Sequence, residues 1–130
     1  MISLPRPLPS VPPYPVEIVS PDDVIQGQAA IFQCRGVVDN TGSVTLRYLN
    51  DVTGEFEVVT TGDKSVSNEQ VDSCKSRHDV TYTLTLDMTF NNTNFRCETS
   101  PAFNASEERT INVVPGEFIL MIDSLTRLIL

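Results

Sequence analysis

Three cysteines and one histidine are the side chains of this 130-residue sequence whose chemistry could define a site. Cys34 and Cys97 lie in apolar, strand-like segments, whereas Cys74 lies in a polar stretch close to His78. A zinc site with four protein ligands would need all four side chains to converge, and the sequence has no Cys-x-x-Cys pair. We therefore favour a disulfide between Cys34 and Cys97, which indicates an oxidising compartment.

Once that pair has formed, Cys74 has no partner within the chain, so we expect either a free thiol or a disulfide-linked dimer through Cys74. A neighbouring imidazolium lowers the pKa of a thiol, so Cys74 and His78 could form an activated nucleophile. Their polar setting favours a spare cysteine beside a solvated loop histidine instead. We therefore predict no catalytic residues and a protein that is not an enzyme.

Acidic side chains offer the other candidate ligands. Asp22 and Asp23, together with Asp79 or Asp87, could bind calcium, which takes about six to eight oxygen ligands. No EF-hand-like spacing supports such a site, and we interpret the pair as a solvated acidic turn; we predict no metal and no cofactor. The formal net charge of −8 argues against nucleic acid as a partner, because binding it depends on Lys and Arg.

Two N-glycosylation sequons agree with an extracellular or cell-surface location. They begin at Asn91, in Asn91-Asn92-Thr93, and at Asn104, in Asn104-Ala105-Ser106. Both fall at predicted loops, where a glycan can be accommodated. The sequence therefore predicts glycans at both asparagines.

The element that must position Cys97 lies in residues 81–98. Apolar and polar side chains alternate from residue 81 to residue 90, which predicts a strand with one buried face and one solvated face. Four small polar residues interrupt the pattern, and a second short strand at residues 95–98 carries Cys97. A helix does not fit, because apolar side chains two apart would lie on opposite faces.

The rest of the sequence also predicts short strands separated by turns. A turn with short strand character covers residues 24–28, and residues 64–79 are polar with at most one short strand, near 65–67 or 69–71. We interpret Glu107, Glu108 and Arg109 as a solvated strand edge that discourages edge pairing. The predicted fold is all-β, a two-sheet antiparallel sandwich. Its other strands are expected at residues 16–19, 29–36, 43–49, 55–59 and 107–114.

Both ends of the chain differ from the predicted domain at residues 16–115. Residues 1–15 hold most of the nine prolines, which predicts an extended arm or linker rather than a ligand for a proline-reading domain, although Pro9 and Pro12 have P-x-x-P spacing. The arm has no signal-peptide core, so we expect a fragment of a longer receptor or adhesion protein, or an incomplete gene model.

Residues 116–130 form an apolar tail that is too short for a membrane span, which needs about 20 residues. Asp123 and Arg127 interrupt it, and its spacing predicts a short amphipathic helix, or a poorly packed tail, outside the sandwich. Its apolar face could dock on the sandwich, a neighbouring domain or a membrane surface. Read-through at a truncated gene end is the alternative origin. We predict no transmembrane span in this chain.

Taken together, these features resemble the immunoglobulin domain over residues 16–114. The two cysteines lie 63 positions apart, each on a strand, and a further strand begins within about twelve residues of the first. Residues 27–34 resemble strand B of that family, residues 82–86 strand E and residues 95–97 strand F. The resemblance implies a buried inter-sheet disulfide from Cys34 to Cys97, in a domain of the intermediate or C2-like set.

Two departures from the family concern the core. Leu46 occupies the place of the tryptophan that the family packs on its disulfide, and Tyr48 could compensate for the lost ring. Phe95 replaces the tyrosine two residues before the second cysteine, so the tyrosine-corner hydrogen bond cannot form. We predict that the core around the disulfide contains Phe32, Leu46, Leu84, Leu86 and Phe95.

The resemblance implies a function in extracellular recognition or adhesion by protein–protein binding. The expected partner is another protein, for example a second immunoglobulin-like domain. The alternative is a structural spacer in a multidomain ectodomain, with no partner of its own. The fold alone cannot decide between these two classes.

Overall fold

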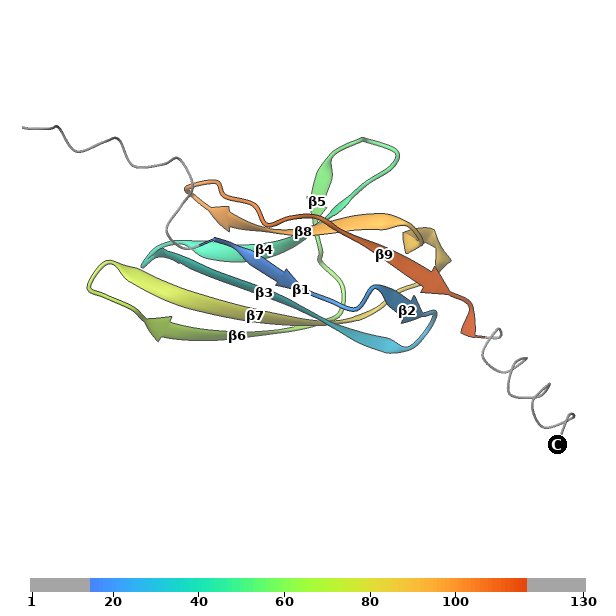
Figure 1. Ribbon diagram of the computed structural model, residues 1–130, viewed down its shortest axis with the longest axis horizontal. Helices are drawn as coiled ribbons and strands as arrows, with labels where there is room; N and C mark the ends of the chain where they lie inside the picture. The colour runs from blue at the N-terminus through green and yellow to red at the C-terminus, as the bar shows by residue number, and fades with distance from the viewer. Residues whose placement is uncertain (1–14, 117–130) are drawn as a thin grey trace, which may run out of the picture.

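Nine strands and one short 3-10 helix make up residues 15–116, which are the residues that the computed structural model describes (Figure 1). The predicted proline-rich arm and apolar tail fall almost wholly on residues 1–14 and 117–130, outside the described residues. No helix within residues 15–116 has the length and apolar character needed to cross a membrane. In chain order, the elements are β1 (Glu17–Val19), β2 (Asp23–Ile25), β3 (Ala29–Asp39), β4 (Ser43–Leu49), β5 (Phe56–Val58), β6 (Asp63–Gln70), β7 (Lys75–Thr85), η1 (Met88–Phe90), β8 (Thr93–Ser100) and β9 (Arg109–Val114).

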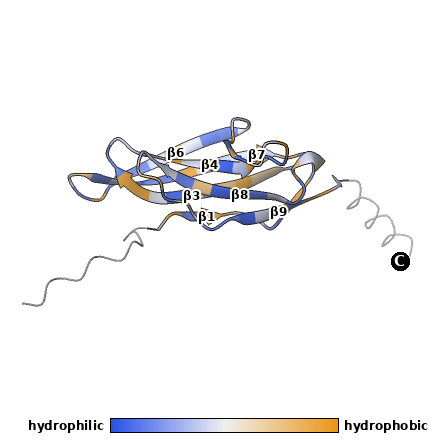
Figure 2. Cartoon of the chain, turned by 90° about the horizontal axis from the view of Figure 1, so that it is seen from above, coloured by the Kyte–Doolittle hydropathy of each residue, from blue (hydrophilic) through white to orange (hydrophobic). Residues whose placement is uncertain are grey.

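The strands form two sheets that pack face to face, as the alternating sequence patterns predict. One sheet has four strands in the order β1-β3-β7-β6, and the other has five in the order β2-β9-β8-β4-β5. Within the described residues, all pairings of these strands are antiparallel except that of β2 with β9, which is parallel. Seen from above, hydrophobic and hydrophilic residues alternate along the strands, as a sandwich core requires (Figure 2).

The core lies between the two sheets and contains every residue predicted to surround the disulfide. Phe32, Leu46, Leu84, Leu86 and Phe95 are all buried, with exposed fractions of 4% or less. The remaining buried apolar residues come from both sheets and include Ile18, Val24, Val44, Val80, Tyr82, Ile111 and Val113. Both inner faces therefore contribute to one continuous cluster.

The N-terminal part of the domain changes sheet between β1 and β2. Glu17 in β1 pairs with Arg35 in β3, whereas Val24 in β2 pairs with Val113 in the opposite sheet. Between the two strands lies Pro21, which cannot donate a ladder hydrogen bond and so ends β1. β1 and β2 therefore form an edge strand of each sheet, although both lie within residues 17–25.

The prediction of at most one short strand in residues 64–79 was wrong. These residues form most of a long hairpin, in which β6 pairs with β7 from Asp63 to Gln70 without a break in register. The alternating pattern is missing because every residue of β6 is exposed, so neither face selects apolar side chains. Gly62 comes immediately before this strand, at φ +82°, where a Cβ atom would overlap the backbone oxygen of Thr83.

The ten-residue strand predicted from residue 81 to residue 90 ends early. The strand stops at Thr85, and Met88–Phe90 form η1 although apolar and polar residues continue to alternate. Asp87 caps the turn, because its Oδ1 accepts the Thr89 N–H at 2.9 Å. Phe90 then packs edge-on against Tyr48, with ring centroids 5.3 Å apart, while Met88 is left partly exposed.

Candidate protein-binding face

The outer surface of β4 and β8 carries a compact group of charged side chains. Buried Leu46 and Cys97 alternate with outward-facing neighbours, among them Arg47 on β4 and Arg96 and Glu98 on β8. Arg47 and Arg96 lie directly opposite each other in the strand register. Like charges in such a pair are destabilising, so an acidic neighbour is needed.

Glu98 is that neighbour, and it contacts both arginines. Its Oε2 accepts the Arg96 Nε–H at 2.6 Å, and its Oε1 lies 2.9 Å from Arg47 Nε. The second approach is poorly aligned for a hydrogen bond and is best described as an ion contact, since Arg47 Nε has no hydrogen-bond acceptor among the described residues. Only 11% of the Glu98 side chain is exposed, so this ion-pair group is better shielded from solvent than most surface pairs.

Two aromatic rings flank the Arg96 guanidinium. Its Cζ lies 3.7 Å from the ring centroid of Phe56 on β5 and 5.9 Å from that of Phe103 in the β8–β9 loop. Both distances fall in the range of cation–π contacts. Phe56 is half-buried, whereas Phe103 is 69% exposed, so one ring supports the arginine and the other projects into solvent.

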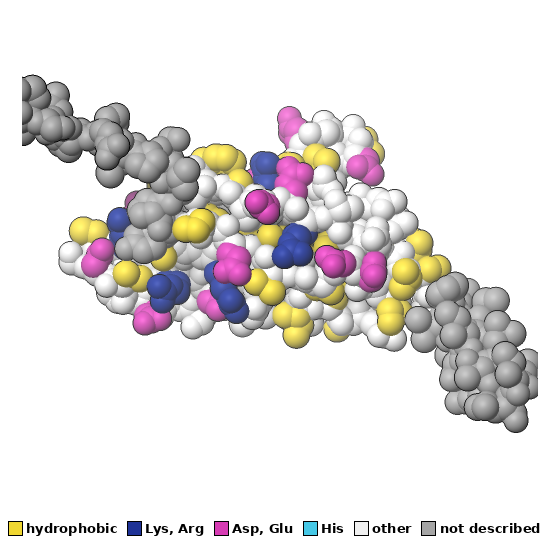
Figure 3. Space-filling model, in the orientation of Figure 1, with side chains coloured by type: hydrophobic (Ala, Val, Ile, Leu, Met, Phe, Trp, Pro, Cys, Tyr) yellow, Lys and Arg dark blue, Asp and Glu magenta, His cyan; other side chains and the backbone are white. Residues whose placement is uncertain are grey.

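The group continues onto β9. Arg96 Nη1 lies 3.7 Å from Glu108 Oε1, and the other oxygen of Glu108 accepts a hydrogen bond from Asn94 Nδ2 at 3.0 Å. Asn94 Oδ1 in turn accepts the Thr110 hydroxyl at 2.7 Å. We call these side chains together the outer face; its members are Arg47, Phe56, Asn94, Arg96, Glu98, Phe103, Glu108 and Thr110. Charged side chains of both signs are interspersed over the surface in Figure 3.

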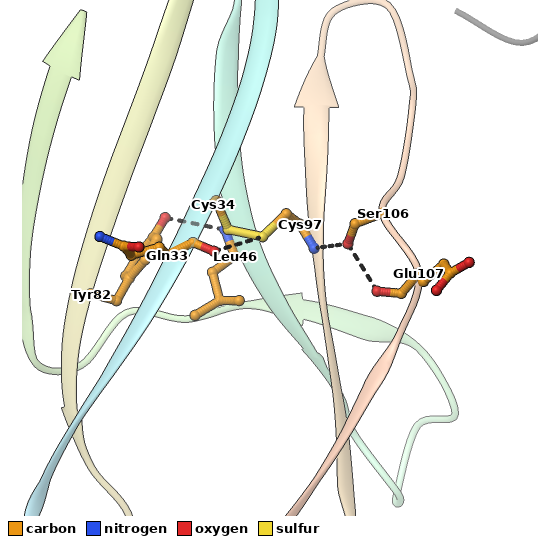
Figure 4. Close-up of a disulfide and its surroundings, with 7 residues drawn as sticks. All are labelled: Gln33, Cys34, Leu46, Tyr82, Cys97, Ser106 and Glu107. Carbon is orange, nitrogen blue, oxygen red and sulfur yellow. Dashed lines mark hydrogen bonds between the residues drawn. A yellow bond between two sulfur atoms is a disulfide. The ribbon is translucent and has the colours of Figure 1, made fainter. Parts of the chain in front are cut away.

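A disulfide connects the strand β8 of the outer face to the opposite sheet. Cys97 lies on β8 between Arg96 and Glu98, and it is bonded to Cys34 on β3 with a Cα–Cα distance of 5.6 Å. The Cys97 N–H donates to Ser106 Oγ at 2.8 Å, and that hydroxyl donates to the backbone oxygen of Glu107 (Figure 4). The β8–β9 loop is therefore held against the strand that carries Arg96.

Beside the disulfide, Tyr82 makes a hydrogen bond between the sheets. Its hydroxyl accepts the backbone N–H of Leu46 at 3.1 Å (Figure 4). The Leu46 N–H has no strand partner in the described part of the chain, because β5 pairs with β4 only from Arg47 onward. Burial raises the pKa of Tyr82 above its ordinary value, and the hydrogen bond from Leu46 partly opposes that shift. Phe95, which lacks a hydroxyl, instead packs its ring 5.1 Å from that of Phe32.

The sandwich resembles solved structures at low sequence identity. No protein-family model matches the chain, and no curated protein matches it. Among solved structures, one described as Rst D1-D2 aligns with 77% of the chain at a TM-score of 0.59 and 15% identity. The BTLA ectodomain aligns with 78% of the chain at a TM-score of 0.51 and 17% identity. The fold is immunoglobulin-like.

The likeness is one of fold, because both identities are low. The matched part of the chain spans about half of the Rst structure (48%) and nearly all of the BTLA ectodomain (98%). In the lettering of immunoglobulin domains, β1, β3, β7 and β6 correspond to strands A, B, E and D. The other sheet adds β2 and the short β5 to strands G, F and C, so the described part of this immunoglobulin-like domain has more strands than the constant type and lacks the C″ strand of the variable type.

The structure places the predicted cysteines and histidine in different surroundings. Cys34 and Cys97 form the inter-sheet disulfide, and Cys74 is an exposed free thiol at the β6–β7 turn. Ser73 and Cys74 are held by Asn40, whose Nδ2 and backbone N–H donate to their carbonyl oxygens. His78 lies on β7 opposite Asn68, whereas the Cys74 sulfur contacts the Ser73 hydroxyl.

The four candidate calcium ligands each have another partner or role. Asp22 lies 3.6 Å from Arg109, Asp23 accepts from the side chain of Asn112, and Asp79 lies 3.4 Å from Arg35. Asp87 caps η1. Within residues 15–116, no group of three or more His, Cys, Asp and Glu side chains is arranged to hold a metal ion.

The two sequons lie at opposite ends of β8. Asn91 is exposed, and its Oδ1 accepts the Val113 N–H at 2.9 Å, a contact that does not use the Nδ2 atom to which an N-glycan attaches. The backbone oxygen of Asn104 accepts the Thr99 N–H at 2.9 Å. Asn104 is therefore bonded to Thr99, whose side chain faces the core, and not to Glu98 on the outer face. Glycosylation at both positions stays a prediction.

The outer face was not predicted from the sequence. Arg96 and Glu98 are two apart on a predicted strand, which was a usable signal that they share a face. Their contacts with Arg47 and Phe56 depend on the register of β8, β4 and β5, which no local pattern specifies. The interpretation of residues 107–109 as a solvated strand edge was incomplete, since Glu108 contacts Arg96 and Arg109 contacts Asp22.

Proposed function

We propose that this immunoglobulin-like domain is an extracellular recognition module that binds a protein partner through the outer face. The observation that carries the proposal is the position of Arg96, stacked on Phe56, paired with Glu98 and adjoining exposed Phe103. Arginine and aromatic side chains are enriched at the centres of protein interfaces. The likeness to an ectodomain and the disulfide support an extracellular location.

The rigidity of the outer face also supports binding. The strand that carries Arg96 and Glu98 is joined to the opposite sheet by the disulfide, and the loop that carries Phe103 is tied back through Ser106. A face that is already ordered loses little side-chain entropy when it binds, so more of the contact energy appears as affinity. The partner that best fits such a mixed charged and aromatic surface is another folded protein domain, such as a second immunoglobulin-like domain.

A structural spacer is the second candidate function. A spacer needs a stable sandwich but no projecting aromatic ring, and the exposed Phe103 beside Arg96 is the feature that favours the binder. An array of extracellular protein domains, probed with the full-length chain in tagged, multivalent form, distinguishes the two. A spacer would bind no domain of the array.

The binding surface is tested with a matched pair of variants. Phe103→Asp changes an exposed ring on the outer face, and Ile31→Asp changes a 58% exposed residue on β3 in the other sheet. Both sites are exposed, so neither variant should unfold the domain. We expect Phe103→Asp to weaken binding by at least about tenfold, as for an interface residue worth more than about 1.4 kcal/mol, and Ile31→Asp to bind normally. Loss of binding only in Ile31→Asp would assign the function to the opposite sheet.

A further inference from the structure

The β6 strand leaves one long sheet edge unpaired in the described part of the chain. β6 is the last strand of the order β1-β3-β7-β6, and all eight of its residues are exposed. The other edge strands, β1, β2 and β5, have three residues each. Within the described residues, β6 is therefore the edge with the length to accept another strand.

The hydrogen bonds of the hairpin identify which backbone groups are free. The Val71 N–H donates to the Lys75 oxygen at 2.9 Å, next to the closing turn. In an antiparallel pair, hydrogen-bonded and non-hydrogen-bonded positions alternate. The odd-numbered residues of β6 therefore bond to β7, and the even-numbered residues, among them Val66 and Asn68, direct N–H and C=O groups away from the sheet.

Several features that usually protect an edge strand are missing from β6. Its register with β7 has no bulge, and it contains no proline. Its charges, on Asp63, Lys64 and Glu69, lie toward its ends, so its centre, residues 65–68, is uncharged. One protective feature is present, because Lys64 is a charged residue that points toward the sheet, with its Nζ 6.0 Å from the ring centroid of Tyr82, but it lies near the end of the strand and not at its centre. Val66 remains 51% exposed at the centre of the strand.

We propose that this free edge of β6 pairs antiparallel with β6 of a second copy of the chain, so that two four-stranded sheets join into one. The favoured register places Ser67 opposite Ser67 of the other copy, because Lys64 then faces Gln70 and Ser65 faces Glu69. Centring the pair on Val66 would set Asp63 opposite Glu69, and like charges directly opposite are destabilising. The favoured register bonds all even-numbered residues of both strands.

This edge is separate from the proposed binding site. β6 belongs to the four-stranded sheet, whereas the outer face lies on β5, β4, β8 and β9. Neither sequon lies in β6, and the predicted glycans at Asn91 and Asn104 would attach to the loops at the two ends of β8, which belongs to the other sheet. Pairing through β6 would leave both outer faces of the dimer open to partners, which raises avidity without any new contact to the partner.

The experiment combines sedimentation with amide hydrogen exchange. The full-length chain carries Cys74→Ser, which removes the exposed thiol and with it any disulfide-linked dimer. We expect a monomer–dimer equilibrium at concentrations up to about 1 mM. On dimerisation, the amides of Val66 and Asn68 should exchange at least about tenfold more slowly. The amides of Ser65 and Ser67, bonded to β7, should be protected at every concentration.

Val66→Pro supplies the matching variant. The Val66 N–H points away from β7, so proline removes no hydrogen bond within the sheet but blocks pairing at the centre of the edge. Val66→Pro should remain monomeric, and Val66→Thr, the control, should dimerise like the parent chain. A parent chain that stays monomeric at the highest concentration would overturn the proposal. A dimer in which Val66 and Asn68 exchange as fast as in the monomer would also overturn it, because it must form through another surface.

Discussion

Replacing Tyr82 by phenylalanine removes one oxygen atom from the core and leaves the ring in place. The Tyr82 side chain is 2% exposed, and its hydroxyl accepts the Leu46 N–H at 3.1 Å. The Tyr82→Phe variant would leave that N–H without an acceptor in a region where water has little access. A buried donor left unpaired costs about 1–3 kcal/mol, so we expect the free energy of unfolding to fall by that amount.

The matched control is Tyr48→Phe. The Tyr48 hydroxyl donates to Glu57 at 3.1 Å in a partly exposed setting, where water can replace the lost bond. We expect that variant to lie within about 0.5 kcal/mol of the parent, as is usual for sites near the surface. Because the two changes are chemically identical, the difference between them isolates the effect of burial.

Urea unfolding of the oxidised, full-length chain, followed by circular dichroism, measures both variants. For a domain of this size, each 1 kcal/mol lowers the melting temperature by about 4–8 °C, so thermal unfolding provides a second readout. If Tyr82→Phe and Tyr48→Phe were equally stable, the Leu46 N–H would have another acceptor. The inter-sheet hydrogen bond would then contribute nothing to the stability of this core.

Three further predictions concern alkaline pH, the core and the cysteines. Burial raises the folded pKa of Tyr82 above its unfolded value near 10. The stability from the neutral hydroxyl is therefore full below about pH 10 and is lost as pH rises through the folded pKa. Urea unfolding measured as a function of pH should show a smaller loss of stability at alkaline pH in Tyr82→Phe than in the parent. Leu84→Ala, at a site 1% exposed, should cost about 2–5 kcal/mol by urea unfolding, whereas Val58→Ala, at a site 41% exposed, should cost much less, and equal costs would contradict the assigned strand face. Cys34→Ala should cost about 2–5 kcal/mol and could abolish folding at 37 °C. Cys74→Ser should leave stability unchanged and remove any dimer seen on a non-reducing gel. A covalent dimer that survives Cys74→Ser would exclude a disulfide between chains through Cys74.

The sandwich could be predicted because its buried faces repeat with the period of a strand. Cys34, Leu84 and Leu46 each lie between two polar neighbours, and all three are buried at 0–1% exposure. β6 could not be predicted in this way, since a strand exposed on both faces has no reason to alternate. The end of β7 at Thr85 could not be predicted either, because capping by Asp87 starts η1 although the alternating apolar pattern continues to Phe90.

The outer face was less predictable than the core for a different reason. Its contacts join residues from β4, β5, β8 and the β8–β9 loop, and each depends on which strands are neighbours. The pairing of Arg47 opposite Arg96, for example, follows from the register of β4 with β8 and from no property of either segment alone. The sequence thus indicated which residues face outward without indicating which of them meet.

The parallel pairing of β2 with β9 determines how the domain responds when it is pulled from its two ends. In the described part of the chain, β2 follows the first strand and β9 is the last strand. Tension on the two ends therefore pulls these parallel strands in opposite directions along their length. The ladder from Asp23 to Val114, with the flanking bonds Asn112 N–H to Asp22 O and Gln26 N–H to Val114 O, is then loaded in parallel rather than opened one bond at a time. If that ladder yields, the disulfide between Cys34 and Cys97, which are 63 positions apart, keeps the segment between them from lengthening the chain. A tether built from this domain would therefore stretch only through the segments outside the two cysteines.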